Sequence, residues 1–137
     1  MTQMSFAQSS KPLANLSLDL DNEWAYLKTH EDPVWESYPS YLNVVVPRIL
    51  QSLACRNLRI TVFVVGQDAA LEYNHEALAQ IARAGHEIGN HSLRHEPWLH
   101  LFSEHDLEQE LAEAERHIHA ATGQKPTGFR GPGYSQS

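Results

Sequence analysis

The chain has 137 residues, of which 42% are apolar and 20% are charged, a composition typical of one globular domain with a hydrophobic core. Seventeen acidic residues against ten Lys and Arg give a formal net charge of −7. This charge argues against a nucleic acid or an anionic membrane as the main partner. A neutral or polar ligand is therefore expected.

The sequence contains no recognisable membrane or export segment. Residues 1–14 lack a sustained apolar stretch, and nowhere do about 18 apolar residues follow one another. A cytoplasmic location is therefore expected. We predict a flexible tail over residues 1–12 and a folded domain over residues 13–137. The single cysteine, Cys55, excludes an internal disulfide, and its apolar neighbours predict a small buried residue.

The first third of the chain predicts one strand, one long loop and one helix. Residues 13–20 alternate apolar and polar side chains, which predicts a strand. Residues 22–39 are rich in aromatic residues and proline, and predict a loop with at most one helical turn over residues 23–28. Apolar residues at helical spacing follow Ser40, a candidate N-cap, up to residues 55–57. Pro47 predicts a kink or a late start in this helix.

The remaining chain continues this alternation of strands and helices. Residues 60–65 (ITVFVV) form a continuous β-branched and aromatic run before Gly66, which is typical of a strand buried on both faces. Glycines that follow the apolar patterns predict where the helices end. We expect helices at 74–84 and 103–123, a loop at 90–101, and short strands at 86–89 and 127–130.

This β-α-β-α-β-α-β order predicts an α/β fold with a parallel sheet and right-handed crossovers. In such folds the ligand site lies at the carboxyl ends of the strands. Three polar groups fall there: Asp19 and Asp21 after the first strand, His91 and His95 after the third, and Arg130 after the fourth. An open four-stranded sheet would also leave an apolar edge, at Phe129 and along Val62 to Val65. Such an edge predicts self-association of the chain.

His91 and His95 lie four residues apart and could share one helical face or one tight turn. With Asp21 they would supply two imidazoles and one carboxylate, a set that suits catalytic zinc and also iron, cobalt or manganese. The alternative is chance, because a chain with nine histidines produces some pairs at this spacing. Spacing alone favours metal binding only slightly.

Asp19 and Asp21 form a close acidic pair, which a divalent cation would stabilise by removing the repulsion between the carboxylates. One carboxylate could bind the metal while the other serves as a base. Arg130 precedes a Gly-Pro-Gly turn, where a fixed guanidinium could hold a carboxylate through two hydrogen bonds. The alternatives are a solvated loop for the two acids and an ordinary surface ion pair for Arg130.

Four segments together resemble the polysaccharide deacetylase family, the NodB homology domain of family 4 carbohydrate esterases. They are 18–21 (LDLD), 61–66 (TVFVVG), 86–95 (HEIGNHSLRH) and 129–135 (FRGPGYS). The resemblance spans residues 16–135 and implies a distorted (β/α)7-type barrel. Since only about four of the seven strands have counterparts here, we expect the chain to be the N-terminal portion of such a domain, truncated at its C-terminus.

The resemblance also implies roles for individual residues. Asp19 is similar to the catalytic base of the family and Arg130 to the arginine that orients this base. The implied metal ligands are Asp21, His91 and His95, and the implied substrate-binding turn consists of Pro132, Gly133 and Tyr134. The expected cofactor is a divalent metal, with Zn²⁺ as the first choice and Co²⁺, Mn²⁺, Fe²⁺ or Ni²⁺ as alternatives.

The implied function is metal-dependent hydrolysis of non-peptide amide bonds, above all removal of the N-acetyl group from a sugar or polysaccharide. Two alternatives stay open. The chain could resemble the relatives that act on cyclic imides and small amides. It could instead be a catalytically incomplete module that binds a metal or a carbohydrate, because the later family motif with the histidine that protonates the leaving amine has no counterpart in residues 1–137.

Overall fold

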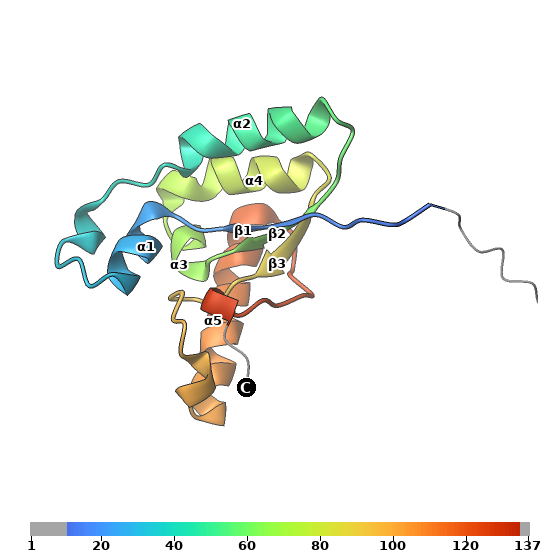
Figure 1. Ribbon diagram of the computed structural model, residues 1–137. Helices are drawn as coiled ribbons and strands as arrows, with labels where there is room; N and C mark the ends of the chain where they lie inside the picture. The colour runs from blue at the N-terminus through green and yellow to red at the C-terminus, as the bar shows by residue number, and fades with distance from the viewer. Residues whose placement is uncertain (1–10, 135–137) are drawn as a thin grey trace, which may run out of the picture.

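The computed structural model describes residues 11–134 (Figure 1), so most of the predicted tail and residues 135–137 lie outside the described part. Three parallel strands form one sheet in the order β1 (Ser17–Leu20), β2 (Thr61–Val64) and β3 (Glu87–Asn90). Asp19 pairs in register with Phe63, which in turn pairs with Gly89. The predicted α/β architecture with parallel strands is confirmed.

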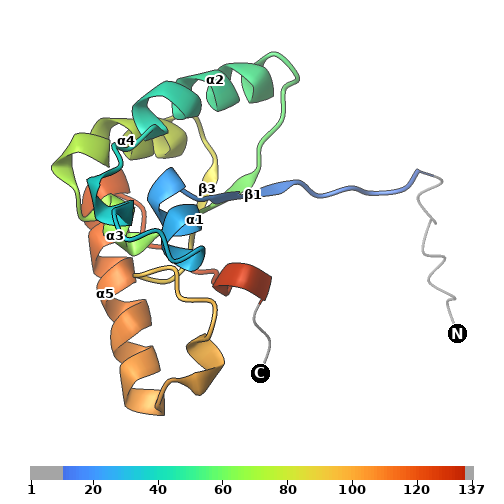
Figure 2. The same ribbon diagram turned by 60° about the vertical axis from the view of Figure 1, so that its left-hand side comes forward.

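Helices connect the strands and form a layer on one face of the sheet (Figures 1 and 2). Within this layer α4 contacts both α2 and α5. The α-helices are α1 (Glu23–Thr29), α2 (Leu42–Ala54), α3 (Gly66–Ala69), α4 (His75–Arg83) and α5 (Glu104–Thr122). Short 3-10 helices are η1 (Trp35–Ser37), η2 (Glu72–Asn74), η3 (Leu99–Leu101) and η4 (Pro132–Tyr134).

The hydrophobic core lies between the sheet and this helical layer. Because side chains alternate along a strand, Leu20, Val62 and Ile88 face the helices and are buried there. They pack with apolar residues of the three long helices, among them Leu42, Val46, Leu78, Ile81, Ala114 and Ile118. Asp19, Phe63 and Gly89 alternate with these residues and therefore belong to the opposite face of the sheet. That opposite face carries part of the candidate site.

Several predicted element ends are confirmed. The Ser103 hydroxyl accepts a hydrogen bond from the backbone N–H of Asp106, which caps α5 as expected. Gly123 ends the same helix with φ 74°, a left-handed conformation that glycine adopts without strain. Helix α2 begins at Leu42 and runs through Pro47. Its N-cap position is Tyr41, although the Ser40 hydroxyl accepts a hydrogen bond from the N–H of Leu42.

Other predictions are wrong. The first strand begins at Ser17, so only the second half of residues 13–20 pairs with a neighbour. Residues 23–29 form a two-turn helix, whose first N–H is bound by the Asn22 side chain, where we predicted one turn at most. Residues 127–130 make a single parallel bridge, between Phe129 and Asn90, instead of a fourth strand. Cys55 is exposed, because it lies just beyond the end of α2.

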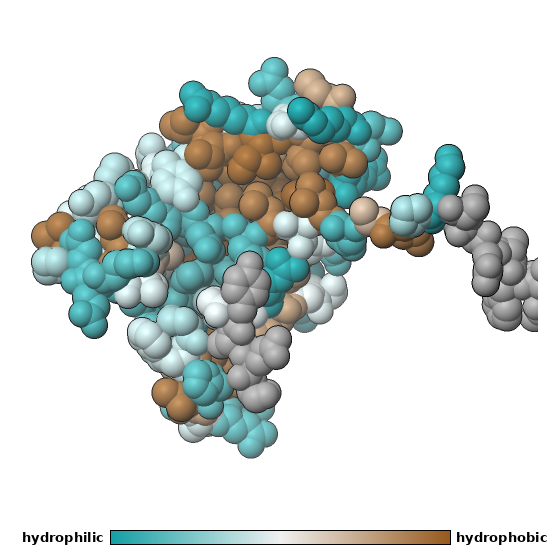
Figure 3. All heavy atoms as spheres, in the orientation of Figure 1, coloured by the Kyte–Doolittle hydropathy of each residue, from teal (hydrophilic) through white to brown (hydrophobic). Residues whose placement is uncertain are grey.

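The predicted apolar edge is also misplaced. Val62 to Val64 belong to β2, which is the central strand and therefore has no free edge. Phe129 is 47% exposed, as expected of an edge position. Figure 3 shows a hydrophobic surface between α2 and β1, to which Leu18, Ile49 and Leu50 contribute as partly buried residues. Within residues 11–134, no helix combines the length and the apolar character that a membrane span requires.

Candidate metal centre

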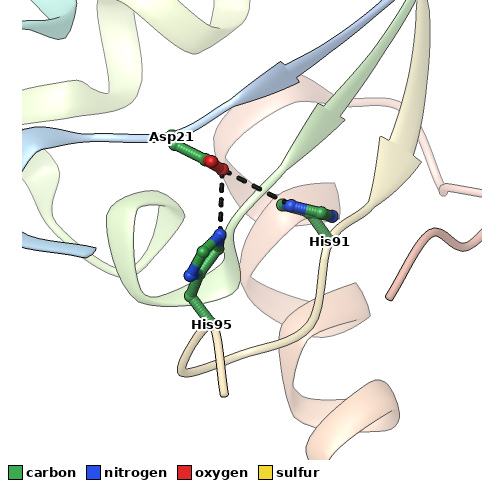
Figure 4. A group of neighbouring side chains, drawn as sticks. All are labelled: Asp21, His91 and His95. Atoms are coloured by element: carbon green, nitrogen blue, oxygen red, sulfur yellow. Dashed lines mark ion pairs between the residues drawn. The ribbon is translucent and has the colours of Figure 1, made fainter. Parts of the chain in front are cut away.

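Three predicted ligands meet at the carboxyl ends of the strands (Figure 4). Asp21 follows β1 directly, His91 follows β3 directly, and His95 lies within the loop between β3 and η3. The Asp21 Oδ1 atom lies 3.1 Å from Nε2 of His95 and 3.4 Å from Nε2 of His91. One ligand atom from each residue can be chosen so that all three lie within 4.8 Å of one another.

The buried atoms of this group are suited to a cation. Asp21 Oδ1 and His95 Nε2 are buried, and neither has a hydrogen-bond partner among the described residues. Their separation of 3.1 Å is short enough for a hydrogen bond, yet the geometry forms none. Burying unpaired polar atoms costs free energy, and a divalent ion between them would satisfy both. Two imidazoles and one carboxylate are a donor set found in catalytic zinc sites.

His91 is oriented by the backbone of the Arg130 segment. Its Nδ1 atom lies 2.7 Å from the carbonyl oxygen of Arg130. A carbonyl can only accept, so Nδ1 carries a proton, and Nε2 is the ring nitrogen that lies toward Asp21. The side chain is nearly inaccessible, with 2% of its surface exposed. Metal-binding histidines characteristically donate their second ring N–H in this way.

The histidine pair lies on a tight turn, which settles the choice between a turn and a helical face. Ser92 and His95 have φ values of 66° and 54°, in the left-handed region that only a well-held segment keeps. The Asn90 side chain accepts a hydrogen bond from the N–H of Ser92, and the Ser92 hydroxyl accepts one from the N–H of His95. These local bonds compensate for the unfavourable backbone conformation.

Neighbouring helices hold the same turn from two sides. The buried Glu110 carboxylate of α5 accepts hydrogen bonds from the N–H groups of Leu93 and Arg94. From α3, the N–H groups of Gly66 and Gln67 donate to the carbonyl oxygens of Ser92 and Leu93. The turn is therefore fixed before any ion binds, as a preorganised site requires.

The histidines also determine the charge state of Asp21. Burial raises the pKa of Asp21, but the close approach of His91 and His95 lowers it more. The net effect holds the pKa of Asp21 well below its usual range. Asp21 is therefore ionised at neutral pH, which is the form that binds a cation.

Asp19 and Arg130 form the second part of the site. The guanidinium of Arg130 donates to Oδ1 of Asp19 over 2.8 Å and to the hydroxyl of Ser17 over 2.7 Å. The guanidinium also lies over the Phe63 ring, 4.2 Å from its centroid. The other oxygen of Asp19, Oδ2, lies 3.9 Å from Nε2 of His91. One Asp19 oxygen is therefore bound to Arg130 while the other faces the histidines.

The predicted substrate-binding turn lies close to the histidine loop. Pro132, Gly133 and Tyr134 form η4, and Gly133 adopts φ 65°. A Cβ atom on Gly133 would lie 2.9 Å from Cβ of Pro97, two residues after His95, so the turn packs tightly there. The side chain of Tyr134 is outside the described part of the structure. A role of the turn in substrate binding stays a prediction.

Sequence reasoning missed two acidic residues that adjoin the site. Glu110 holds the histidine turn, and nothing distinguishes it from the other acids of α5 in the sequence. Asp68 is 1% exposed and accepts hydrogen bonds from the side chains of Asn22 and Trp24. Its position could have drawn attention to it, because it closely follows a buried strand at the edge where the other polar groups gather.

Comparisons with known proteins agree with this geometry. The family model described as polysaccharide deacetylase matches residues 27–137. A solved Mycobacterium smegmatis protein described as a polysaccharide deacetylase is 30% identical, with a TM-score of 0.73 over 90% of this chain and 44% of that one. A cobalt-bound family 4 acetyl xylan esterase of Clostridium thermocellum is 26% identical, with a TM-score of 0.67 over 90% of this chain and 50% of that one.

A third similar structure is a family 4 pseudoenzyme from Bacillus anthracis, which is 25% identical with a TM-score of 0.70 over 93% of this chain and 38% of that one. The chain thus spans half or less of the length of these three structures. Its parallel β/α units correspond to part of the distorted (β/α)7 barrel expected of the family. This chain belongs to the polysaccharide deacetylase family.

Proposed function

We propose that this chain carries the metal-binding and base-bearing part of a metal-dependent amide hydrolase, with removal of the N-acetyl group from a sugar or polysaccharide as its reaction. One observation carries the proposal. Three ligand atoms converge, two of them buried without a hydrogen-bond partner, beside a carboxylate that an arginine holds in place. This arrangement has both parts that metal-assisted hydrolysis needs, a cation site and a base.

Asp21, His91 and His95 would hold the ion, with Zn²⁺ as the expected metal. When bound, a divalent cation polarises an amide carbonyl and makes a water molecule easier to deprotonate. The cobalt ion in the Clostridium thermocellum esterase supports a divalent cation in this family. The negative charge of ionised Asp21 suits a cation of this kind.

Asp19 would remove the proton from the attacking water. Its Oδ2 atom is on the side of the histidines, whereas Oδ1 is occupied by Arg130. Arg130 would keep this carboxylate correctly oriented. In the hydrolysis the oxygen of water bonds to the acetyl carbon, the amide C–N bond breaks, and the leaving nitrogen takes up the proton removed from the water, which gives acetate and a free amine. Pro132, Gly133 and Tyr134 would line the sugar-binding side.

A non-catalytic member of the family is the second candidate. The similarity to the Bacillus anthracis pseudoenzyme supports it, since a related structure is described as a mutant of that protein with restored enzymatic activity. Small differences around a shared fold can therefore separate active from inactive members. In this case the chain would bind a metal or a carbohydrate without hydrolysis.

Acetate release from N-acetylglucosamine oligomers separates the two candidates. The purified chain, loaded with Zn²⁺, is compared with Asp19→Asn, in which the base is lost and the three metal ligands remain. We expect the rate to fall about 10²- to 10⁴-fold, the usual range for a general base, with unchanged metal content. Asp106→Asn serves as the matched control on the exposed side of α5. Full metal content without hydrolysis by the unaltered chain would favour the non-catalytic candidate.

A further inference from the structure

A buried polar cluster adjoins the candidate metal centre. It consists of Asp68, Asn22, Trp24, Ser40 and Asn74. Oδ1 of Asp68 accepts hydrogen bonds from Nδ2 of Asn22 over 3.0 Å and from Nε1 of Trp24 over 2.8 Å. Ser40 connects the amides of Asn22 and Asn74 over 2.9 and 2.7 Å. Since Asn22 directly follows Asp21, the first oxygen of Asp68 anchors the segment that carries one metal ligand.

The second oxygen of Asp68 has no such partner. Four buried side-chain atoms lack a hydrogen-bond partner among the described residues: Asp21 Oδ1, His95 Nε2, Asp68 Oδ2 and His95 Nδ1. The first two face each other in the metal centre. The remaining two are a carboxylate oxygen, which accepts, and an imidazole nitrogen, which can donate. A buried donor on His95 and a buried acceptor on Asp68 are therefore left without partners.

Asp68 and His95 are also neighbours in the fold. Helix α3 carries Asp68 and is hydrogen-bonded to the histidine turn. The N–H groups of Gly66 and Gln67 donate to the carbonyl oxygens of Ser92 and Leu93. Burial raises the pKa of Asp68 above its usual range, because the hydrogen bonds from Asn22 and Trp24 and the charge of His95 compensate for the burial only in part. A buried carboxylate of this kind needs further donors to keep its charge.

We propose that Asp68 is the positioning residue for the metal ligand His95. Its Oδ2 atom accepts a hydrogen bond from one water molecule, which itself accepts the Nδ1–H of His95, so that the Nε2 lone pair of His95 points at the cation. This inference rests on the metal centre of the proposed function. It gives His95 the kind of support that His91 receives from the Arg130 carbonyl, and it follows the general pattern of carboxylate, histidine and metal.

The Asp68→Asn variant tests this assignment because an amide keeps one accepting oxygen of the carboxylate and replaces the other oxygen with a donating NH₂ group. The amide oxygen can still accept from Asn22 and Trp24, but the NH₂ group then presents a donor to His95. The matched control is Ser40→Ala, which removes hydrogen bonds from the same buried polar cluster without altering the group offered to His95.

Two measurements are made on each purified chain. Long-range ¹H–¹⁵N NMR of the metal-free chain reports which ring nitrogen of His95 carries the proton, with His95→Gln used for assignment. Titration with Zn²⁺ gives the affinity. We expect Nδ1 of His95 to carry a proton in the unaltered chain and in Ser40→Ala, and to be unprotonated in Asp68→Asn, where only Nε2 carries one. The Zn²⁺ affinity of Asp68→Asn should fall about 10- to 100-fold, the range for such supporting partners.

Two results would overturn the assignment. One is an Nε2–H form of His95 in the unaltered chain, a result that needs no variant to fold. The other is an equal loss of Zn²⁺ affinity in Asp68→Asn and Ser40→Ala with no change of tautomer, which would mean that Asp68 only stabilises the fold. If the unaltered chain bound no metal, the proposed function would fail, whereas the tautomer would still decide the role of Asp68.

Discussion

At the scale of single residues, the orientation of the Asp19 carboxylate depends on how the Arg130 guanidinium is held. Arg130 makes three contacts at once: hydrogen bonds to Asp19 and Ser17, and stacking on Phe63. The planar guanidinium allows all three, whereas an ammonium group is a point charge without a fixed fork. The identity of the residue as arginine therefore matters, beyond its positive charge.

The Arg130→Lys variant tests this point. A lysine keeps the charge but loses at least one hydrogen bond to a charged or polar partner, each worth about 1.5–3 kcal/mol when charged groups are involved. We expect the rate of acetate release to fall about 10- to 100-fold with unchanged Zn²⁺ affinity. Arg83→Lys, at an exposed ion pair with Glu76, is the control and should keep full activity. An active Arg130→Lys chain would refute the orienting role.

His86 is a second residue for which a prediction can be tested, because its protonation affects the stability of the fold. It is 4% exposed, and its Nδ1 accepts a hydrogen bond from the N–H of Ile60, which requires a ring with an unprotonated Nδ1. Burial and the nearby Arg59 lower the pKa of His86 below the ordinary value of about 6.5 for a histidine. The unfolded chain therefore takes up this proton first as the pH falls. Neutral His86 therefore stabilises the folded state fully above about pH 6.5, and this stabilisation is lost as the pH falls below that value.

Chemical unfolding between about pH 7.5 and pH 5.5 measures this effect. The free energy of unfolding should decrease toward the acidic end, and it should decrease less in His86→Asn, whose side-chain oxygen replaces the accepting nitrogen without titrating. His100→Asn, at an exposed position, should follow the unaltered chain. Identical pH profiles for the unaltered chain and His86→Asn would show that His86 does not contribute.

At the scale of secondary-structure elements, the short helix α3 is held against α5 by a glycine. A Cβ atom on Gly66 would lie 2.7 Å from Cα of Ala114 and 3.0 Å from Cδ1 of Leu93. The backbones approach so closely that no larger residue fits. Because the N–H of Gly66 also donates to Ser92, this contact positions the histidine turn as well.

Gly66→Ala should therefore be destabilising. We expect the free energy of unfolding to drop by about 1–3 kcal/mol, the usual cost of overpacking a core. Gly128→Ala is the matched control, since its Cβ atom would meet Phe63 at 3.9 Å, an ordinary contact distance. Denaturant unfolding of both variants measures the difference. Equal stabilities would mean that α3 and α5 can separate without cost.

The sequence predicted an element correctly where the repeat of its apolar residues, or a single capping residue, determines where the element begins and ends. The long apolar and polar pattern of α5 between Ser103 and Gly123 specified both ends of the helix. Residues 127–130 have the composition of a strand, yet only Phe129 pairs with Asn90, since strand pairing depends on neighbours distant in the sequence. The length of helix α1 was underestimated, at one turn instead of two, because its Asn22 cap is hidden within an aromatic, proline-rich segment.

At the scale of the whole molecule, the candidate site is made by the sheet. Asp21 and His91 are far apart in the sequence, and parallel pairing of β1, β2 and β3 brings the ends of their strands together. The sequence order and the family resemblance were enough to predict that Asp21, His91 and His95 lie together, and their role as metal ligands stays a prediction. They could not reveal the Arg130 carbonyl behind His91 or the Glu110 contact with the turn, because such supporting contacts depend on packing between elements.

The most direct measurement is titration of the metal-free chain with Zn²⁺, followed by calorimetry. One ion should bind per chain, and its binding should raise the melting temperature, since a ligand of the folded state at about 100 times its Kd adds about 2.7 kcal/mol. His91→Ala should abolish both effects, while the exposed His100→Ala should retain them. Absence of binding by the unaltered chain, or unchanged binding by His91→Ala, would contradict the metal centre.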